Sequence, residues 1–234
     1  MVDFHSHILP GVDDGSRNEP ESIKLLQEAK EAGFDKVIST SHYALDLYEI
    51  PEYKRVSLIE SLQSEPNIPS IYLGSEIYST HTIIDLIKEG KASTLNNTKY
   101  VLFELPLFGQ FPDLPGLINK IKEYEYIPVL AHPERYHIIQ KDYNFLFTLK
   151  DMGVLFQSNY GSIIGQYGSK AKKIVKKMLK DQLISFMGSD VHRPDTVYPR
   201  MDKILKKISK ITDVGYFEAI TTNNAEAVLE GRNI

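Results

Sequence analysis

Histidines and carboxylates recur in this chain directly after short apolar runs, and this placement is typical of a metal centre. His5 and His7 follow the run 1–4, and His42 follows the run 36–41. Five further side chains of this kind follow later apolar runs: Glu76, Glu104, His132, Asp190 and His192. If these runs are parallel strands, their carboxyl ends meet at one face, and the side chains converge there.

Two of these groups are triplets with paired donors, His5-Ser6-His7 and Asp190-Val191-His192. Side-chain direction repeats every two residues along a strand, so both donors of a triplet point the same way and can bind one ion. Buried carboxylates also need counter-charges, because an unpaired charge in a packed interior is costly. A hydrogen-bonded network of histidines and carboxylates without metal is the alternative. There are too many ligands for one ion, so we expect two or three ions and at least one bridging carboxylate.

The donor set contains nitrogen and oxygen without sulfur, which suits Mn, Fe, Co, Ni or Zn. Clustered ions of this kind polarise a phosphoryl or carbonyl oxygen. They also lower the pKa of a bridging water, which creates a hydroxide nucleophile near neutral pH. The pattern therefore predicts a metal-dependent hydrolase.

The elements that must position these residues are seven apolar runs that are continuous rather than alternating in polarity, as in strands buried on both faces. The polar residues at their ends are 27 to 37 positions apart, which is the spacing of successive βα units. We expect an α/β fold in which seven units close, or nearly close, into a barrel, with an open doubly wound sheet as the alternative. The runs are 1–4, 36–41, 71–75, 100–104, 127–131, 154–158 and 184–188.

Helical patterns separate the apolar runs. The first, about 19–32, has Asn18 as an N-cap, Pro20 in its first turn and Gly33 as its stop. Another, 169–180, places apolar residues on one side and six lysines on the other. We expect that lysine face to be solvated, and a docking patch for an acidic partner is the alternative.

Composition limits the classes of protein that fit. The chain has 234 residues, a net charge of −4 and no cysteine, which argues against a nucleic-acid partner, disulfides and thiolate zinc sites. The first residues show no signal-peptide pattern, and no apolar run approaches the length of a membrane span. We expect one domain, 1–234, in the cytoplasm, without membrane insertion. The oligomeric state is not predicted.

Several motifs carry a family resemblance in addition to these patterns. They occur in family order and span nearly the whole chain, including HILPGVDDGS at 7–16, NNTKYVLFELP at 96–106 and TTNNAEAVL at 221–229. The set resembles the polymerase-and-histidinol-phosphatase (PHP) superfamily, and within it the manganese-dependent bacterial tyrosine phosphatases of capsule and exopolysaccharide operons. The metal-ligand motifs are DFHSH (3–7), DDG (13–15), STSH (39–42), GSEI (74–77), FEL (103–105), AHPERY (131–136) and GSDVH (188–192).

The resemblance implies a distorted (β/α)7 barrel with three ions, most fittingly Mn²⁺, at the carboxyl ends of the strands. Asp14 enters as a ligand through the resemblance alone, with Asp13 as its rival and Asp3 as a supporting or structural acid. Carried over by motif, one ion takes His5, His7, Glu76 and Asp190, a second takes Glu76, Glu104 and His132, and a third takes Asp14, His42 and His192.

A phosphatase also needs cationic donors for the phosphate oxygens. Arg135 matches the family's HxER element and is our first candidate. An arginine that merely pairs with a neighbouring carboxylate is the alternative. The family's second functional arginine has no clean match here, which leaves Arg17, Arg193 and Arg200 as candidates. We assign catalytic roles to Arg135, Asp14 and His192.

The resemblance implies a protein-tyrosine phosphatase that acts on a bacterial tyrosine kinase of capsular or exopolysaccharide synthesis, through attack of a metal-bound hydroxide on the phosphate. The alternatives are a small-molecule phosphatase such as histidinol-phosphatase, a metal-dependent nuclease or amide hydrolase, and a noncatalytic binding module. The longest candidate loops, 43–52, 105–113 and 159–168, are too short for a lid domain, so we expect an open mouth that admits an extended phosphotyrosyl peptide. We expect Tyr43 and Tyr160 to line it, and His81 and His137 to lie on the surface.

Overall fold

The computed structural model describes residues 1–109 and 111–234. Its strands all pair in parallel, in one sheet of order β1-β2-β4 and another of order β3-β5-β6-β7-β8-β9. They are β1 (Val2–Ser6), β2 (Lys36–Ser39), β3 (His42–Tyr43), β4 (Ser70–Leu73), β5 (Glu76–Tyr78), β6 (Tyr100–Glu104), β7 (Ile127–Ala131), β8 (Leu155–Asn159) and β9 (Phe186–Gly188).

Two pairs of these strands are halves of longer segments. β3 continues β2 after a break at 40–41, and β5 continues β4 after a break at 74–75. The single strands that we expected over 36–41 and 71–75 are therefore wrong in detail. Backbone bonding continues through both breaks, since the Gly74 amide donates to the Ser39 carbonyl at 2.9 Å and the Glu76 amide donates to the Thr40 carbonyl at 3.1 Å.

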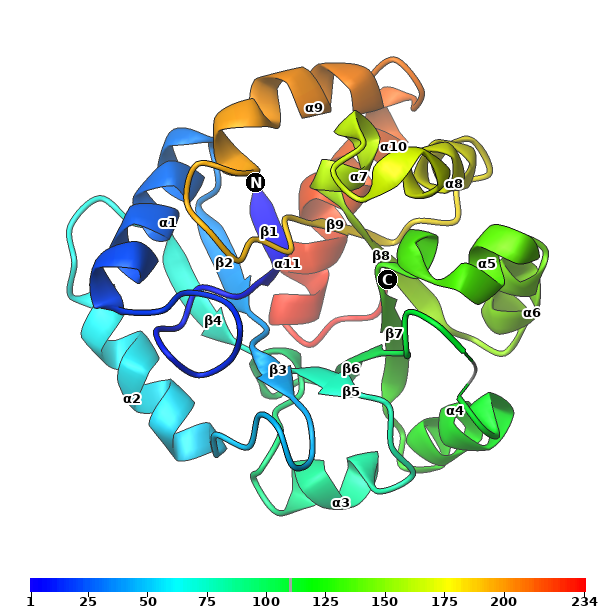
Figure 1. Cartoon of the computed structure of the whole chain (residues 1–234), viewed down its shortest axis with the longest axis horizontal. Coiled ribbons are helices and arrows are strands. Elements are labelled where there is room, and N and C mark those ends of the chain that lie inside the picture. Colours follow the sequence, from blue (N-terminus) through cyan, green and yellow to red (C-terminus); the bar gives the residue numbers. More distant parts are fainter. Residues whose placement is uncertain (110) are drawn as a thin grey trace.

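The last strand unit meets the first one, so the sheets curl into a barrel (Figure 1). The amide of Asp190 donates to the carbonyl of His5 at 2.8 Å, and the amide of His7 donates to the carbonyl of Val191 at 3.1 Å. Gly188 allows this approach, because a Cβ at its position would lie 2.5 Å from Cβ of His5. Strand order around the ring follows chain order, which confirms the (β/α)7 barrel and rules against the doubly wound sheet, in which the order reverses.

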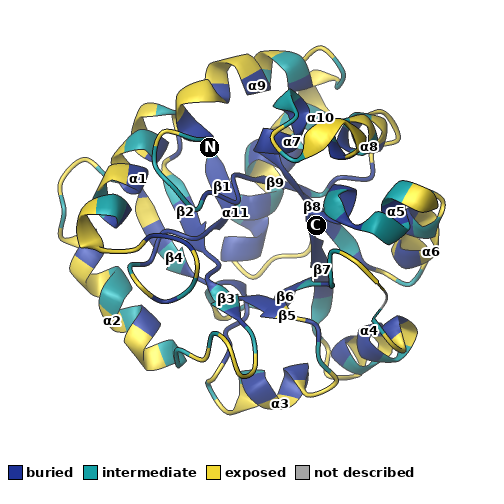
Figure 2. Ribbon diagram, in the orientation of Figure 1, coloured by how far each residue is buried: buried dark blue, intermediate teal, exposed yellow. Residues whose placement is uncertain are grey.

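Helices surround the strands, and Figure 2 shows buried residues on the strands and exposed ones on the outward helix faces. Within the two described ranges, none of the helices is both long and apolar enough to cross a membrane. They are α1 (Glu19–Glu31), α2 (Glu52–Gln63), α3 (Ile83–Lys88), α4 (Leu114–Glu123), α5 (His137–Lys141), α6 (Phe145–Asp151), α7 (Tyr160–Ile164), α8 (Gly168–Lys180), α9 (Met201–Ile208), α10 (Val214–Glu218) and α11 (Asn224–Leu229), with the short turns η1 (Leu95–Asn97), η2 (Pro133–Arg135), η3 (Tyr198–Arg200) and η4 (Ala219–Asn223).

The helix signals in the sequence correspond to local contacts. Asn18 caps α1, because its side chain accepts the Glu21 amide at 3.1 Å, and Gly33 ends the turn at a positive φ of 89°. The lysine-rich segment forms α8, which buries an apolar stripe of Ala171, Val175, Met178 and Leu179. Ile174 is half-buried and packs against the same hydrophobic core.

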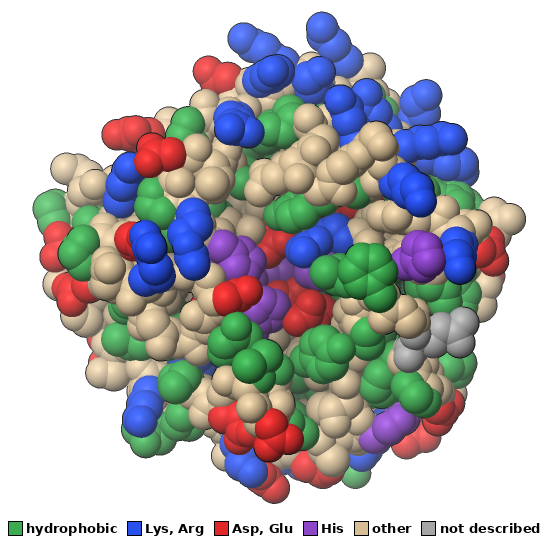
Figure 3. Space-filling model, in the orientation of Figure 1, with side chains coloured by type: hydrophobic (Ala, Val, Ile, Leu, Met, Phe, Trp, Pro, Cys, Tyr) green, Lys and Arg blue, Asp and Glu red, His purple; other side chains and the backbone are tan. Residues whose placement is uncertain are grey.

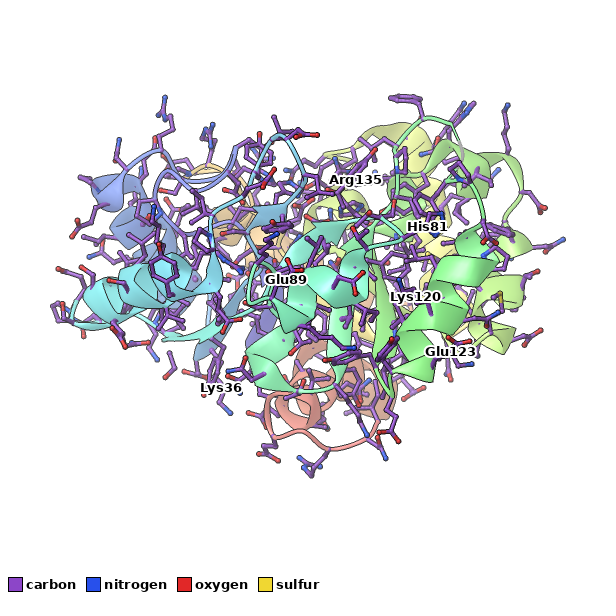
Figure 4. All side chains as sticks on the ribbon, turned by 90° about the horizontal axis from the view of Figure 1, so that it is seen from below. Lys36, His81, Glu89, Lys120, Glu123 and Arg135 are labelled. Carbon is purple, nitrogen blue, oxygen red and sulfur yellow. The ribbon has the colours of Figure 1, made fainter. Side chains whose placement is uncertain are left out.

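The interior is apolar at one end of the barrel and polar at the other. Phe4 stacks on Phe186 with ring centroids 3.9 Å apart, and α11 packs Ala225 and Val228 into the same cluster. Figure 4 shows Lys36, the first residue of β2, toward the end near α11, and Arg135, just after β7, at the opposite end. The carboxyl ends of the strands therefore form the mouth of the barrel.

Candidate metal centre

The mouth gathers the side chains that the sequence singled out. In Figure 3, histidines and acidic side chains fill the hollow centre of this face. Most come from the end of a strand or from the residues just after it, and His42 and Glu76 follow the breaks after β2 and β4, so the parallel barrel explains their convergence. Asp14 lies instead on the loop between β1 and α1. The residues are His5, His7, Asp14, His42, Glu76, Glu104, His132, Asp190 and His192.

The deepest group contains His5, His7, Glu76 and Asp190, as expected for the first ion. Nε2 of His5 lies 3.0 Å from Nε2 of His7. One Glu76 oxygen lies 3.2 and 3.3 Å from these two nitrogens, and one Asp190 oxygen lies 3.7 and 3.5 Å from them. Two imidazoles and two carboxylates thus point at one small volume.

The protonated nitrogen of each histidine ring indicates which kind of group fits between His5 and His7. Nδ1 of His7 donates to Asp13 at 2.8 Å, and Nδ1 of His5 pairs with the Gln157 oxygen at 2.8 Å. With both Nδ1 atoms protonated, neutral rings direct two lone pairs at each other across 3.0 Å. These lone pairs repel unless a proton or a metal ion lies between the nitrogens, and the Glu76 and Asp190 oxygens that face the same volume add ligands, so the residues fit a bound metal ion.

The neighbouring acids Asp13 and Asp14 have different roles. Asp13 accepts His7 Nδ1 and the His42 amide, both at 2.8 Å, so it orients other residues. Burial raises the pKa of Asp13, but His7 and the amides of His42 and Gly15 together outweigh it, so the pKa of this carboxyl stays well below its usual range. Asp14 faces outward, with one oxygen 3.5 Å from His42 Nε2 and 3.3 Å from His192 Nε2. Of the two acids, Asp14 is therefore the one placed to bind a metal ion together with His42 and His192.

The other donors form two overlapping groups. Nδ1 of His42 lies 3.1 Å from Glu76 and 3.0 Å from Glu104, while its Nε2 faces Asp14. His132 pairs with Glu76 at 2.7 Å but lies 4.0 Å from Glu104. Donor atoms lie within 4.8 Å of one another in the sets His7–Asp14–His42–His192, His42–Glu76–Glu104 and His5–His7–Asp190.

These sets differ from the division into three ions that the resemblance implies. His42 lies between the second and third groups instead of in the third alone, and His7 lies between the first and third. The division among individual ions therefore stays a prediction.

Electrostatics at the centre are dominated by Glu76. Burial lowers the pKa values of His5 and His42, but the carboxylates around them together outweigh it, Glu76 first, and raise these pKa values to about 9 and about 10. Burial would raise the pKa of Glu76 itself, yet His5, His42 and His132 hold it well below its usual range. Glu76 is fully buried and ionised, so its negative charge is stable only with cations around it, either protonated histidines or metal ions.

Strand β8 carries no metal ligand predicted from the sequence. Its polar side chains instead form hydrogen bonds to ligands on the neighbouring strands. Gln157 accepts His5 Nδ1 at 2.8 Å and the His132 amide at 3.3 Å, and it donates to Asn159 at 3.0 Å. Asn159 in turn donates to Asp190 at 2.6 Å. Sequence reasoning missed both residues, although polar side chains two positions apart at the end of an apolar run were the signal.

Backbone conformation at two of the ligands is unusual. His132 has φ 32° and Asp190 has φ 52°, both in the left-handed region that non-glycine residues seldom adopt. Such conformations persist where surrounding contacts enforce them, which is common at functional sites. Here each one turns the chain directly after a strand and aims the side chain into the mouth.

Arg135 lies over the mouth beside the ligands. Its Nη1 donates to Asp190 at 2.7 Å, and its guanidinium lies 4.5 Å from the centre of the Tyr167 ring. Burial lowers the pKa of Arg135, but Asp190, Tyr167 and Glu76 together outweigh it and raise the pKa, so the side chain stays charged. The arginine lines two adjoining hollows of about 370 and about 260 Å³. It thus pairs with a neighbouring carboxylate and also faces the open space.

The three other arginine candidates differ in position. Arg193 lines the larger hollow with Arg135, and its Nη1 donates to the carbonyls of Asp14 at 2.8 Å and His192 at 2.6 Å. Arg17 pairs with Glu21 on the surface. Arg200 is exposed at the end of η3 and lines neither hollow. Among the three, Arg193 is the one that reaches the candidate site.

Our expectation for the tyrosines at the mouth is wrong. Tyr43 and Tyr160 are 2% and 0% exposed, because both rings pack in the main hydrophobic core. The mouth is lined instead by Tyr78 and Tyr167, and Tyr48 stacks on His42 with ring centroids 5.8 Å apart. Sequence patterns cannot distinguish a tyrosine that is buried beneath a mouth loop from one that is exposed at the mouth.

Comparisons with known proteins agree with this geometry. A family model for capsular polysaccharide synthesis, CpsB/CapC, matches residues 1–230. The putative tyrosine-protein phosphatase CapC of Staphylococcus aureus is 32% identical over 241 residues, which cover 100% of this chain and 93% of the relative. The tyrosine-protein phosphatase YwqE of Bacillus subtilis is 30% identical over 241 residues, with the same coverage.

Solved structures lead to the same group. One, described as YwqE from Bacillus subtilis and CpsB from Streptococcus pneumoniae, unique metal-dependent tyrosine phosphatases, superposes with a TM-score of 0.90 at 28% identity and covers 100% of this chain and 96% of its own. Histidinol phosphate phosphatase from Lactococcus lactis, with a TM-score of 0.58 and 15% identity over 90% of this chain and 92% of its own, shares the fold. The chain belongs to the CpsB/CapC family of capsular polysaccharide synthesis.

Proposed function

We infer that this protein is a metal-dependent protein-tyrosine phosphatase, a phosphoric monoester hydrolase of capsular or exopolysaccharide synthesis. The observation that carries the inference is the convergence of imidazoles and carboxylates around buried Glu76, next to a charged arginine, at an open barrel mouth. Relatives that match the whole chain bear the name tyrosine-protein phosphatase, which supports the same activity. The proposal treats residues 1–234 as one catalytic domain.

The donor set supports two or three transition-metal ions, with Mn²⁺ the best candidate and Fe, Co, Ni or Zn able to use the same nitrogen and oxygen ligands. His5, His7, His42, His132 and His192 would hold them together with Asp14, Glu76, Glu104 and Asp190. When bound, such ions polarise a phosphoryl oxygen and lower the pKa of water, which supplies a nucleophile at neutral pH.

The chain's own residues supply orientation and charge. Arg135 is held between Asp190 and the Tyr167 ring, so its guanidinium is positioned before substrate arrives. A planar guanidinium can donate two parallel hydrogen bonds to nonbridging phosphate oxygens. We propose that this contact strengthens as charge develops on the phosphoryl group, and that Arg193 offers a second cation across the larger hollow.

Asp14 and His192 form the outer edge of the centre. Their side chains are 54% and 28% exposed and line both hollows together with Arg135. We propose that they contact the reacting group as well as hold an ion. A hydrogen bond to His192 keeps the pKa of Asp14 below its usual range, so Asp14 stays an anion at neutral pH.

The shape of the mouth favours a phosphotyrosyl side chain. Tyr78, Leu105 and Leu107 line the smaller hollow beside the ligands, and their apolar surface suits an aromatic ring. Phosphotyrosine also projects its phosphate farther from the peptide backbone than phosphoserine does. We propose a tyrosine kinase of capsule synthesis as the physiological substrate, and the cytoplasm as the place of the reaction.

Steady-state kinetics with Mn²⁺ supplied tests the proposal. The substrates are a phosphotyrosyl peptide, the matching phosphoseryl peptide and histidinol phosphate. We expect the highest kcat/KM for the phosphotyrosyl peptide. A preference for histidinol phosphate would instead assign the protein to small-molecule metabolism, and hydrolysis of none of the three would refute the phosphatase assignment.

A further inference from the structure

Positive charge is concentrated on helices α8 and α9. These two helices hold nine lysines and one aspartate, whereas the rest of the chain holds eighteen basic and thirty acidic side chains. An acidic protein therefore carries one strongly basic region, which we call the lysine surface. Its residues are Lys170, Lys172, Lys173, Lys176, Lys177 and Lys180 on α8 and Lys203, Lys206 and Lys207 on α9.

The helices direct this charge outward. Both bury an apolar stripe against the barrel, which leaves their opposite faces to the lysines. In the described ranges, Lys177 is the one of the nine with a carboxylate within 4.0 Å, that of Asp181 at 2.8 Å. Figure 3 shows the basic side chains gathered on the upper right of the mouth face. The surface therefore has little internal charge compensation and attracts anions.

The lysine surface is continuous with the larger hollow. Helix α8 begins at Gly168, directly after Tyr167, whose hydroxyl donates to Asp190 at 3.1 Å. Gln166 and Tyr167 line that hollow with Arg135 and Arg193. A peptide that leaves the hollow along this side thus passes from two arginines onto the first turns of α8.

The exposed apolar side chains favour a protein partner over a lipid surface. Basic helices that bind membranes insert large hydrophobic residues beside their lysines. In the described part of the chain, the exposed large hydrophobic residues lie outside α8 and α9, at Leu47 and Phe108 among other positions. Lysine also tolerates varied acidic sequences, because it acts as a mobile point charge without fixed geometry.

We propose that the lysine surface binds an acidic segment of the phosphoprotein substrate, next to the phosphotyrosine that enters the hollow. This inference rests on the proposed function and adds a substrate class to it, namely phosphotyrosyl sites flanked by acidic residues. Attraction between exposed charges acts mainly on encounter, so it raises kcat/KM at low ionic strength and weakens as salt is added.

The experiment compares three substrates with full-length, Mn²⁺-loaded protein. These are a phosphotyrosyl peptide with acidic flanks, one of equal length with neutral flanks, and p-nitrophenyl phosphate. The test variant is Lys170→Glu/Lys173→Glu/Lys206→Glu. The control variant, Lys54→Glu/Lys91→Glu/Lys150→Glu, makes the same change in net charge at exposed lysines outside the lysine surface.

We expect the unmodified protein to prefer the acidic peptide about tenfold in kcat/KM at low salt, at the lower end of electrostatic steering effects. The test variant should lose this preference yet hydrolyse p-nitrophenyl phosphate normally, and the control variant should keep it. An unchanged preference in the test variant would overturn the proposal. If, in addition, the test variant no longer bound phosphatidylglycerol vesicles, the surface would be assigned to a membrane.

A second measurement separates this proposal from the proposed function. Fluorescence anisotropy with non-hydrolysable phosphonate versions of both peptides reports binding without turnover. If no phosphotyrosyl substrate is hydrolysed, the proposed function fails, and anisotropy still decides the lysine surface. Equal affinity of the test variant and the unmodified protein for the acidic phosphonate would refute the surface alone.

Discussion

Gln157 offers a direct test of whether strand β8 sets the chemistry of its neighbours. Its orientation is fixed by the His132 amide, which can only donate and must therefore face the amide oxygen. The same oxygen accepts the proton on His5 Nδ1, so that His5 Nε2 is the nitrogen that loses its proton and binds a metal ion at the centre. Gln157→Met keeps side-chain length and removes both the acceptor and the donor.

The magnitude follows from the bonds that are lost. Without the acceptor, His5 can carry its proton on Nε2, the atom that faces His7 and Glu76. Loss of a residue that orients a metal-binding histidine typically lowers metal affinity by roughly 10- to 100-fold. That corresponds to about 1.4 to 2.8 kcal/mol of metal-binding free energy. The buried His132 amide, left without its acceptor, should also cost about 1–3 kcal/mol in the free energy of unfolding.

The assay is Mn²⁺ binding by isothermal titration calorimetry, with turnover measured at saturating Mn²⁺. Ser158→Ala is the matched control, because Ser158 lies on the same strand and points its hydroxyl at Met178, away from the centre. Gln157→Glu keeps an acceptor for His5 but cannot donate to Asn159, so its affinity should fall less than that of Gln157→Met. Wild-type Mn²⁺ affinity in Gln157→Met would refute the reasoning about the tautomer.

The remaining predictions concern the centre itself. Glu76→Ala should lower both metal content and turnover, because Glu76 faces four histidines, and full metal occupancy by elemental analysis would contradict its bridging role. Arg135→Ala should lower kcat by roughly 10²-fold with metals retained. Arg135→Lys should rescue poorly, since lysine lacks the bidentate geometry, and wild-type kinetics in either variant would make Arg135 structural. In ion-free protein at pH 7, His5 and His42 are protonated because their pKa values are raised to about 9 and about 10. Mn²⁺ binding should therefore release about two protons, and the Mn²⁺ affinity should increase as pH rises toward those values. Calorimetric titration in buffers of different ionisation enthalpy measures the number of protons released, and a value of zero would contradict this prediction.

The sequence predicted the features that depend on local pattern. Continuous apolar runs and their spacing were enough for a parallel α/β fold, because parallel strands buried on both faces leave that signature, whereas the choice of the barrel over a doubly wound sheet needed the structure. Histidines and carboxylates at the strand ends were enough for the centre, because closure brings all carboxyl ends to one mouth. Asp14 was different, since DDG reads equally well as a turn, and only the family resemblance selected it over Asp13.

What the sequence could not predict depends on residues far apart in the chain. The break that separates β4 from β5 is held by Arg55 of α2, which is 1% exposed and donates to the Gly74 carbonyl at 2.9 Å and to the Ser75 hydroxyl at 2.5 Å. Burial lowers the pKa of Arg55 to about 10, so the side chain still carries its charge at neutral pH. The residue pattern of α2 gives no sign that one arginine points inward. This arginine nevertheless fixes the backbone directly before Glu76, so the position of the central carboxylate depends on a contact that no local pattern records.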